Sequence, residues 1–454
     1  MSTATTLVGG LARLVPKPDN NHPAWLTQVR QDAYEWVAKH GFPTQKDEDW
    51  RYTRLGPILE VPFVPALPSM AEMGHQSSSN TINRVDDGSI VPADLGGPRL
   101  VFINGFFAPE LSRLTALPEG SMVTNLASVL VEEAQDLRPF LSRPFGEYDH
   151  AFTALNTALA EDGAFIQLAA NTTIDLPIQL VFLSNSGGSV VVSSPRSVVI
   201  VGPGSRATIV ETHVGIPGDV YCTNAVTQVV LESGAQIEHY KIQDESESAF
   251  HLALLDVRQS RDSQFSSHSV ALGSSIARHE VRVHLEGAGA HVNLDGLYMG
   301  RGDQHHDNPV IVEHSAPGCT SRQLYKGVLD DSSQGVFNGR VVVSPGADGT
   351  DAAQTNKNLL LSDHAEVDTR PRLEIFADDV KCTHGAAVGQ LDEHAVFYLR
   401  SRGIPHHAAR GLLIYAFVNE MVERLRLAPV RSLVANLVNK RLATNDSMIQ
   451  GTFS

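Results

Sequence analysis

Cys382 and His384 are the two residues whose types and spacing best suit metal chemistry in this sequence. Residues two apart in an extended strand share a face, so a thiol and an imidazole would lie side by side. That pair of donors suits a soft or borderline metal such as iron or zinc, and Lys381 is expected to lower the pKa of the thiol. Two ligands do not complete a tetrahedral site, so other segments or a partner chain would have to supply the rest. On chemistry alone, a buried structural cysteine beside a surface histidine remains an open alternative.

Histidine is unusually frequent, with 19 in the chain and ten of them between residues 200 and 320. These ten are His213, His239, His251, His268, His279, His284, His291, His305, His306 and His314. His279 and His284 are one residue too far apart for the zinc-binding pair of a metalloprotease helix, and the residues between them alternate as in a strand. On a strand, His279 and His284 point to opposite faces, as do His305 and His306. We therefore expect structural or surface roles for the histidine-rich stretch 213–314.

Composition excludes several classes of protein. With 35 Lys and Arg against 51 Asp and Glu among 454 residues, the net charge of −16 disfavours non-specific nucleic-acid binding. No run of 18 apolar residues predicts a membrane span. The three cysteines are far apart, which excludes a disulfide framework, and no basic head with an apolar run opens the chain. A reduced, cytoplasmic setting is expected. No phosphate-binding GxxxxGK[ST] loop is present, so we expect no ATP hydrolysis by this chain alone.

A repeat runs from about residue 163 to 389, where short runs rich in Val, Ile, Thr and His alternate with small polar residues. Turn-like residues open such runs at Gly204, Gly234, Asp262, Gly289 and Gly318, in steps of 27 to 30 residues. Later starts follow at about half that step. A strand-and-turn unit of about 15 residues, two to a coil, predicts a β-solenoid, because one coil cannot bury its own inner face. An antiparallel sandwich is the alternative, and the even spacing disfavours it.

Helical patterns flank this repeat on both sides. An apolar stripe predicts a helix in 24–40 that ends at Gly41, and Asn104-Gly105 suits a hairpin turn. Further helices are expected at 122–137, at 149–161, after Asp392, after Pro405 and over 430–442. We predict a mainly β fold: a right-handed parallel β-helix (β-solenoid) flanked by N-terminal and C-terminal α-helical domains. The expected domains are 1–160, mostly helical with a mobile connection near 66–98; 161–389, the β-helix core; and 390–454, helical.

Three segments resemble one known family. They are GFPTQKDEDWRYT at 41–53, the stretch 355–393 that includes ADDVKCTHG, and FYLRSRGIPHHAARGLLIYAFVNEM at 397–421. Each is similar to the SufD subunit of the SUF iron–sulfur cluster assembly machinery, and the stretch 355–393 is the most specific of the three.

This resemblance implies a scaffold without catalysis of its own. Such a protein pairs with its sister SufB through the end of the β-helix and binds the ATPase SufC through its C-terminal helices. His384 matches the family's proposed ligand at the SufB interface, with Cys382 beside it. The resemblance implies a transient iron–sulfur cluster shared with the partner, and no tightly bound cofactor in the isolated chain. Neither a nucleic acid nor a membrane is an expected partner.

Three alternatives stay open at this point. SufB-type sister scaffolds have a longer N-terminal region with extra cysteines and a different sequence at the Cys382–His384 position, which favours SufD over SufB. A homodimer could form when the sister is absent. A β-helix carbohydrate-active enzyme would need carboxylates clustered on one face of the solenoid, and such enzymes usually work outside the cytoplasm.

Overall fold

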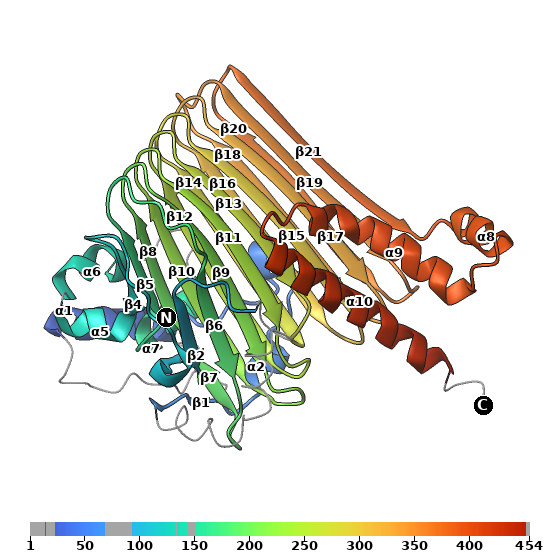
Figure 1. Cartoon of the computed structure of the whole chain (residues 1–454), viewed down its shortest axis with the longest axis horizontal. Helices are drawn as coiled ribbons and strands as arrows, with labels where there is room; N and C mark the ends of the chain where they lie inside the picture. Colours follow the sequence, from blue (N-terminus) through green and yellow to red (C-terminus); the bar gives the residue numbers. More distant parts are fainter. Residues whose placement is uncertain (1–13, 15–22, 69–92, 133, 143–149, 451–454) are drawn as a thin grey trace, which may run out of the picture.

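The chain folds into a β-solenoid of about 8 turns with helices at both ends (Figure 1). The computed structural model describes residues 14, 23–68, 93–132, 134–142 and 150–450. Successive long strands alternate between two sheets, and each of these strands pairs in parallel with the strand two further along the chain. The mainly β solenoid with helical ends, predicted from the 15-residue spacing, is therefore confirmed.

Two sheets form the walls of the solenoid. Sheet A contains β1 Val64–Pro65, β4 Met122–Asn125, β5 Ala164–Leu168, β7 Val191–Ser193, β8 Arg196–Val201, β10 Cys222–Leu231, β12 Phe250–Gln259, β14 Ile276–Leu285, β16 His305–His314, β18 Gln334–Val343 and β20 Glu366–Ile375. Sheet B contains β2 Arg99–Ile103, β3 Phe106–Phe107, β6 Ile178–Ser184, β9 Arg206–Gly215, β11 Gln236–Asp244, β13 Gln264–Ala271, β15 His291–Gly300, β17 Thr320–Leu329, β19 Thr350–Leu360 and β21 Val380–Gln390.

The helices lie at the two ends of the chain. They are α1 Ala24–His40, α2 Gly56–Leu59, α5 Leu126–Glu132, α6 Ala134–Leu141, α7 Ala151–Leu159, α8 Glu393–Ser401, α9 His406–Glu423 and α10 Ala428–Gln450, with short 3-10 turns at Glu48–Trp50 and Pro109–Leu111. In the part of the chain that the structure describes, no helix is long and apolar enough to cross a membrane.

The turns of the solenoid fall where the sequence repeat predicts them. Gly204 and Gly234 have φ angles of 67° and 70°, and Asp262 has a φ of 56°. The N–H of Gly204 donates to Ser233 O at 2.9 Å, and the N–H of Gly234 donates to Arg261 O at 2.9 Å. Each turn thus bonds to the turn of the next coil, which is why residues tolerant of the left-handed region recur at this spacing.

The N-terminal region confirms some local predictions and corrects one. Helix α1 ends at Gly41 and the β2–β3 hairpin turns at Asn104-Gly105, both as predicted. The first part of the expected helix 122–137 is instead strand β4, because Val123 packs into the solenoid core and β4 pairs with β5. Strands β2 and β4 belong to sheets B and A, so both sheets extend into the region before residue 161. Residues 69–92 of the expected connection 66–98 lie outside the described residues.

Helices α9 and α10 cover the outer face of sheet B (Figure 1). Helix α8 begins after Asp392, as predicted, and Asp392 caps it by accepting from the N–H of His394 at 2.9 Å. Val418 and Val434 are fully buried against apolar residues of β11, β13, β15 and β17. This packing fixes the C-terminal region on the solenoid.

The histidine-rich stretch is largely inside the protein, and the expectation of surface roles is wrong for most of it. Eight of the ten histidines are buried, and the other two, His284 and His291, are half-buried. Alternation along a strand tells which residues share a face, but it does not tell whether that face is exposed. In the structure both faces of these strands are covered. His279 points into the lumen and His284 outward, so the prediction of opposite faces is confirmed.

A charged cluster lies in the lumen between β9 and β11. The Glu211 carboxylate accepts from Lys241 Nζ at 2.9 Å and lies 2.7 Å from His213 Nε2. All three side chains are at most 5% exposed. Burial opposes the charge on Glu211, but Lys241 and two histidines outweigh it and hold the pKa of Glu211 well below its usual range. Burial, aided by Lys241, lowers the pKa of His213 to about 4, so this ring is neutral near pH 7.

Candidate functional site

The solenoid ends in an open coil made of β20 and β21. Each is the last strand of its sheet, and within the described residues no further strand pairs with either outer edge. Almost every residue of β21 is exposed, whereas the equivalent residues of β19 are mostly buried or half-buried. Its 11 residues extend for about 36 Å. A long edge with unpaired backbone groups is a ready template for pairing with another chain.

Cys382 and His384 lie on β21 at this open end, with their side chains on the lumen face. The register pairs Cys382 with Ala352 and His384 with Gln354, whose side chains are buried in the lumen. Cys382 is half-buried and packs against an apolar cluster that includes Val341 and Ala352, while His384 is exposed. The structure therefore places the predicted thiol and imidazole on one face. Their role as ligands stays a prediction.

The expected effect of Lys381 on the thiol is wrong. Burial raises the pKa of the Cys382 thiol, and the nearby Asp351 carboxylate adds to this rise. Lys381 points to the other face of β21 and acts on Asp351, whose pKa it helps to lower after Arg322. In the isolated chain Cys382 is therefore a protonated thiol, and it would lose its proton on binding a metal.

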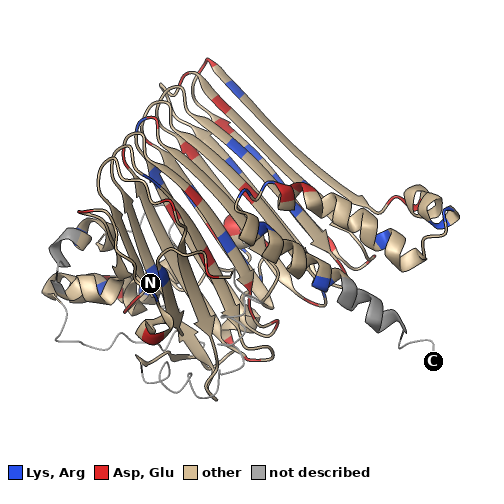
Figure 2. Ribbon diagram, in the orientation of Figure 1, with Lys and Arg blue, Asp and Glu red and all other residues tan. Residues whose placement is uncertain are grey.

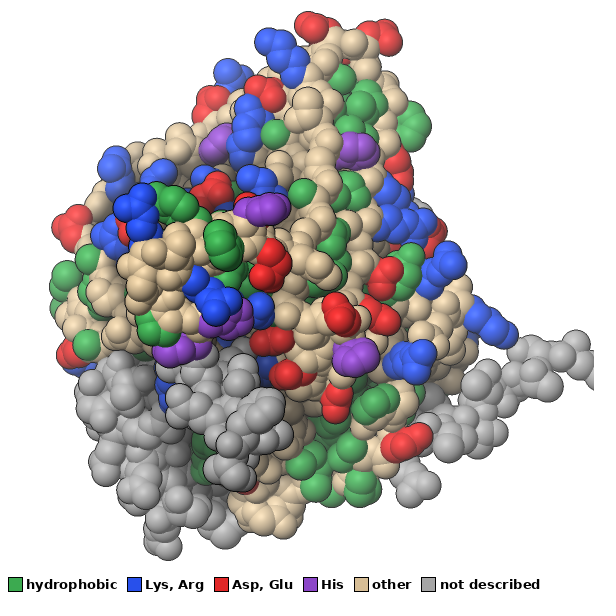
Figure 3. Space-filling model, turned by 90° about the vertical axis from the view of Figure 1, so that its right-hand side faces the viewer, with side chains coloured by type: hydrophobic (Ala, Val, Ile, Leu, Met, Phe, Trp, Pro, Cys, Tyr) green, Lys and Arg blue, Asp and Glu red, His purple; other side chains and the backbone are tan. Residues whose placement is uncertain are grey.

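Exposed apolar residues accompany the open coil. Ile375 and Phe376, at the end of β20, are 41% and 62% exposed, and Val388 of β21 is 49% exposed. Figure 3 views the molecule from this side and shows hydrophobic side chains mixed with basic, acidic and histidine side chains. Figure 2 shows charges of both signs spread over the strands, without one basic stripe. A mixed surface of this kind suits a protein partner better than a polyanion.

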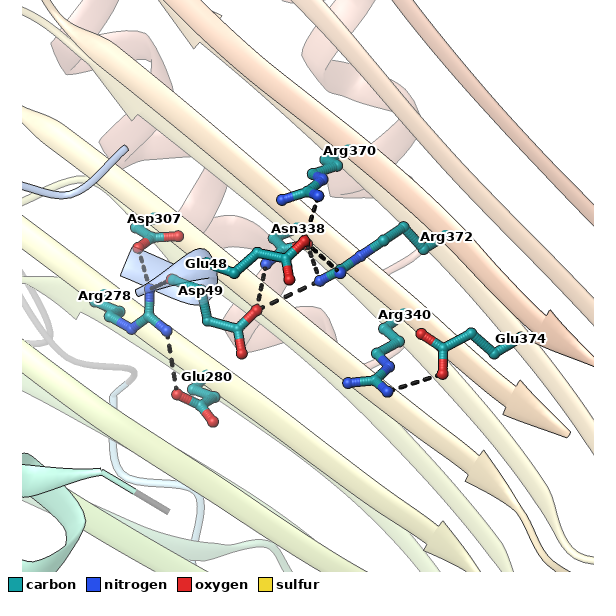
Figure 4. A network of polar contacts seen from close by, with 10 residues as sticks. All are labelled: Glu48, Asp49, Arg278, Glu280, Asp307, Asn338, Arg340, Arg370, Arg372 and Glu374. Carbon is teal, nitrogen blue, oxygen red and sulfur yellow. Dashed lines mark hydrogen bonds and ion pairs between the residues drawn. The ribbon is translucent and has the colours of Figure 1, made fainter. Parts of the chain in front are cut away.

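The N-terminal segment reaches across sheet A to hold β20 (Figure 4). Glu48 accepts from Arg370 and, at 3.1 Å, from Arg372. Asp49 accepts from Asn338 Nδ2 at 3.1 Å and from Arg372 Nη2 at 3.4 Å. We call these five residues the N-terminal clamp. The hydrogen bond that Glu48 accepts from Arg370, together with the positive charges of Arg370 and Arg372, lowers the pKa of Glu48.

Trp50 fixes the clamp onto the middle of the solenoid. Its ring is 3% exposed and lies 3.8 Å from the guanidinium carbon of Arg278. Arg278 in turn pairs with Asp307 and Glu280 (Figure 4). Beside these residues lies a cleft of about 410 Å³ between the N-terminal region and sheet A. The segment 41–53, which the sequence singles out, thus connects the N-terminal region to the last coils.

The C-terminal helices begin directly after the open coil. Helix α8 starts three residues after the end of β21, and its Phe397 and Tyr398 are 70% and 58% exposed. Lys326 holds α9 on β17, donating to Phe417 O at 2.7 Å and pairing with Glu420 at 2.6 Å. Exposed aromatic side chains are common in protein interfaces, so α8 offers a second surface for a partner.

Sequence reasoning missed the N-terminal clamp and the residue beneath His384. Arg370 and Arg372 are two apart on one strand, which signals a charged face, but nothing local indicates that Glu48 lies opposite them. Gln354 pairs with His384 only through the register between β19 and β21. The 15-residue spacing could have placed these two residues on neighbouring coils.

Comparison with known proteins agrees with this architecture. Residues 182–417 match the family described as SUF system FeS cluster assembly, SufBD core domain, and residues 18–180 match the SufBD protein N-terminal region. The chain is 31% identical to the SufBD family iron–sulfur cluster assembly protein slr0076 of Synechocystis, covering 92% of this chain and 91% of the relative.

Two relatives carry the SufD name. The chain is 31% identical to the iron–sulfur cluster assembly protein SufD of Escherichia coli, covering 91% of this chain and 92% of that protein. It is 25% identical to SufD of Bacillus subtilis, covering 71% of this chain and 74% of that protein. With both domains matched and relatives of this name aligned over most of their length, the chain belongs to the SufBD family of SUF iron–sulfur cluster assembly proteins and is SufD-like.

Proposed function

We propose that this chain is a non-catalytic scaffold subunit that pairs with SufB through its open coil and binds the ATPase SufC through its C-terminal helices. The observation that carries the proposal is the unpaired end of the solenoid at β20 and β21, with Cys382 and His384 on it. An iron–sulfur cluster in assembly is then the cargo of the paired subunits.

The chemistry of the two side chains fits this cargo. A cysteine thiolate is the usual ligand of iron–sulfur clusters, and an imidazole can replace a thiolate on one iron. His384 is exposed and free to face a partner, while Cys382 is half-buried beside it. Two donors are too few to hold a cluster, so the partner supplies the remaining ligands. The raised pKa of Cys382 means that cluster binding releases a proton from the thiol.

The exposed surface of α8 supports the second part of the proposal. Phe397 and Tyr398 lie next to the open coil in sequence, because α8 follows β21 directly. A nucleotide-driven movement of an ATPase bound to α8 would therefore act close to the strand that carries His384. This proximity links ATP hydrolysis by a partner to the place of cluster assembly.

Two substitutions separate the two partner surfaces. Co-expression with SufB and SufC, followed by native mass measurement of the purified complex, gives the subunit stoichiometry. Val388→Asp places a charge at the open coil and should remove SufB while SufC remains bound. Tyr398→Asp should remove SufC while SufB remains bound. Leu114→Asp, at a residue that is 54% exposed and far from both surfaces in sequence, is the control.

The outcome of this experiment is decisive for both surfaces. Loss of SufC from Val388→Asp together with loss of SufB from Tyr398→Asp would contradict the proposal. Retention of both partners in both variants would contradict it as well. A stable homodimer that excludes SufB would contradict the pairing with SufB as well.

A further inference from the structure

Two buried glutamines form an amide ladder in the lumen directly beneath His384. Gln323 of β17 and Gln354 of β19 are ladder partners, and their side chains are 3% and 1% exposed. Gln354 Nε2 donates to Gln323 Oε1 at 2.8 Å. The next position of this ladder, on β21, is His384.

The carbonyl oxygen of Gln354 is buried and has no hydrogen-bond partner among the described residues. A buried acceptor without a partner typically costs about 1–3 kcal/mol, and nearly all buried acceptors in proteins are satisfied. Nitrogen and oxygen lie on opposite sides of a planar amide. Because Nε2 of Gln354 points back toward β17, Oε1 points forward toward β21.

His384 occupies the ladder position next to Gln354 on the side away from β17. Paired residues of neighbouring strands point to the same side, and strands lie about 4.8 Å apart, so an imidazole on β21 lies within reach of the amide on β19. Gly339 on the opposite wall leaves room for the amide, since a Cβ there would lie 2.1 Å from Gln354 Nε2. The lumen thus keeps Gln354 in place below the histidine.

We propose that Gln354 is a positioning residue for His384, whose ring donates one N–H to Gln354 Oε1. This hydrogen bond fixes the tautomer of the ring and leaves the other ring nitrogen, with its lone pair, facing out of the open coil. Histidines that bind metals almost always donate the N–H of their second nitrogen to a carboxylate, a backbone carbonyl or a water, and the amide oxygen of glutamine can accept in the same way. Forming this hydrogen bond needs only a rotation of the exposed His384 side chain and no partner chain, so only its use in holding iron rests on the proposed function.

The test compares Gln354→Met, which removes the acceptor at nearly constant volume, with Gln354→Glu, which keeps an acceptor. Gln264→Met, at an exposed glutamine of β13 outside the ladder, is the control. Thermal unfolding of each variant establishes that it folds. The first readout is the ¹⁵N spectrum of the His384 ring in the metal-free full-length chain, with His384→Ala used to assign the signals.

The proposal predicts a single tautomer in the unmodified chain and in Gln264→Met, and the loss of that single tautomer in Gln354→Met. An unchanged ring spectrum in Gln354→Met overturns it. The second readout is the iron affinity of the complex with SufB and SufC, which should fall about 10–100-fold in Gln354→Met and recover in Gln354→Glu. If His384→Ala retains iron while the ring spectrum responds to Gln354→Met, the ligand role of His384 fails and the hydrogen bond stands.

Discussion

Replacing Lys241 with methionine tests the charged cluster in the lumen. The substitution leaves the Glu211 carboxylate, 2% exposed, without the lysine 2.9 Å away. His213 replaces Lys241 only in part, because burial, the main cause, still lowers the pKa of its ring when the contribution of Lys241 is gone. Leaving a buried charge unpaired costs about 3–5 kcal/mol. Protonating Glu211 instead costs about 1.4 kcal/mol for each pH unit above its usual pKa, which is about 3.7 kcal/mol at pH 7.

The cost of leaving Glu211 charged and the cost of protonating it are similar at pH 7. We therefore expect Lys241→Met to lower the free energy of unfolding by about 3–4 kcal/mol. In the variant, the folded state holds Glu211 partly protonated near pH 7 and increasingly so as the pH falls, whereas the unfolded state does not. Stability of the variant should therefore recover as the pH falls from 7.5 to 6, with a slope that approaches about 1.4 kcal/mol per unit at the lower pH. In the unmodified chain the pKa of Glu211 is lowered, so the carboxylate stays charged in this range.

Urea unfolding at pH 6.0, 6.75 and 7.5 measures this difference, with Lys357→Met as the control because Lys357 is exposed on β19. We expect the control to change stability by no more than about 0.5 kcal/mol at any pH. Adding Glu211→Gln to Lys241→Met should restore part of the loss and remove its pH dependence. A Lys241→Met variant as stable as the control, or a loss that does not depend on pH, would refute the reasoning.

Three further predictions follow from the described contacts. Replacing both acids of the N-terminal clamp, Glu48→Gln with Asp49→Asn, should speed hydrogen exchange of the β20 amides several-fold and leave exchange in β12 unchanged. The reason is that exposed ion pairs contribute about 0.2–1 kcal/mol each. Exchange in β20 as slow as in the unmodified chain would exclude a stabilising role of the clamp. Burial opposes the charge on His284, but Asp256 and Glu313 outweigh it and raise its pKa to about 9. The stability from this raised pKa is complete below about pH 6.5 and lost as the pH rises through 9, so His284→Gln should flatten the alkaline fall of the unfolding midpoint, and a fall of the same size in the variant would contradict the assignment. Gly327→Ala should lower stability by about 1–3 kcal/mol in urea unfolding, because a Cβ there would lie 2.4 Å from the Tyr298 ring; Gly385→Ala, where nothing lies within 4 Å, is the control, and a loss no larger than that of the control would contradict the packing.

The solenoid is predictable from the sequence because its turns recur in register. Gly204, Gly234 and Asp262 adopt positive φ angles at the positions where the repeat begins. Local apolar patterns are less specific, since the run 122–125 suits a helix by itself and becomes a strand only because β5 is there to pair with it.

The location of the histidines and the clamp depends on tertiary structure. Alternation predicts that His279 and His284 point to opposite sides, and this is confirmed, but it does not tell which side is the lumen. Glu48 contacts Arg370 more than 300 residues away, and no local pattern indicates such a pair. For the candidate site, the sequence places Cys382 and His384 on one face, and only the fold reveals that this face is the open end of the lumen.

The iron content of the complex with SufB and SufC, purified anaerobically from cells, is the most direct test of the proposed scaffold role. We expect His384→Ala to leave the subunit stoichiometry unchanged and to lower the iron and sulfide bound per complex by about tenfold or more, within the range that loss of a metal-site residue produces. His364→Ala is the matched control, because His364 is an exposed histidine in the turn before β20. A His384→Ala complex that binds as much iron and sulfide as the His364→Ala complex would contradict the role of His384 at the site of cluster assembly.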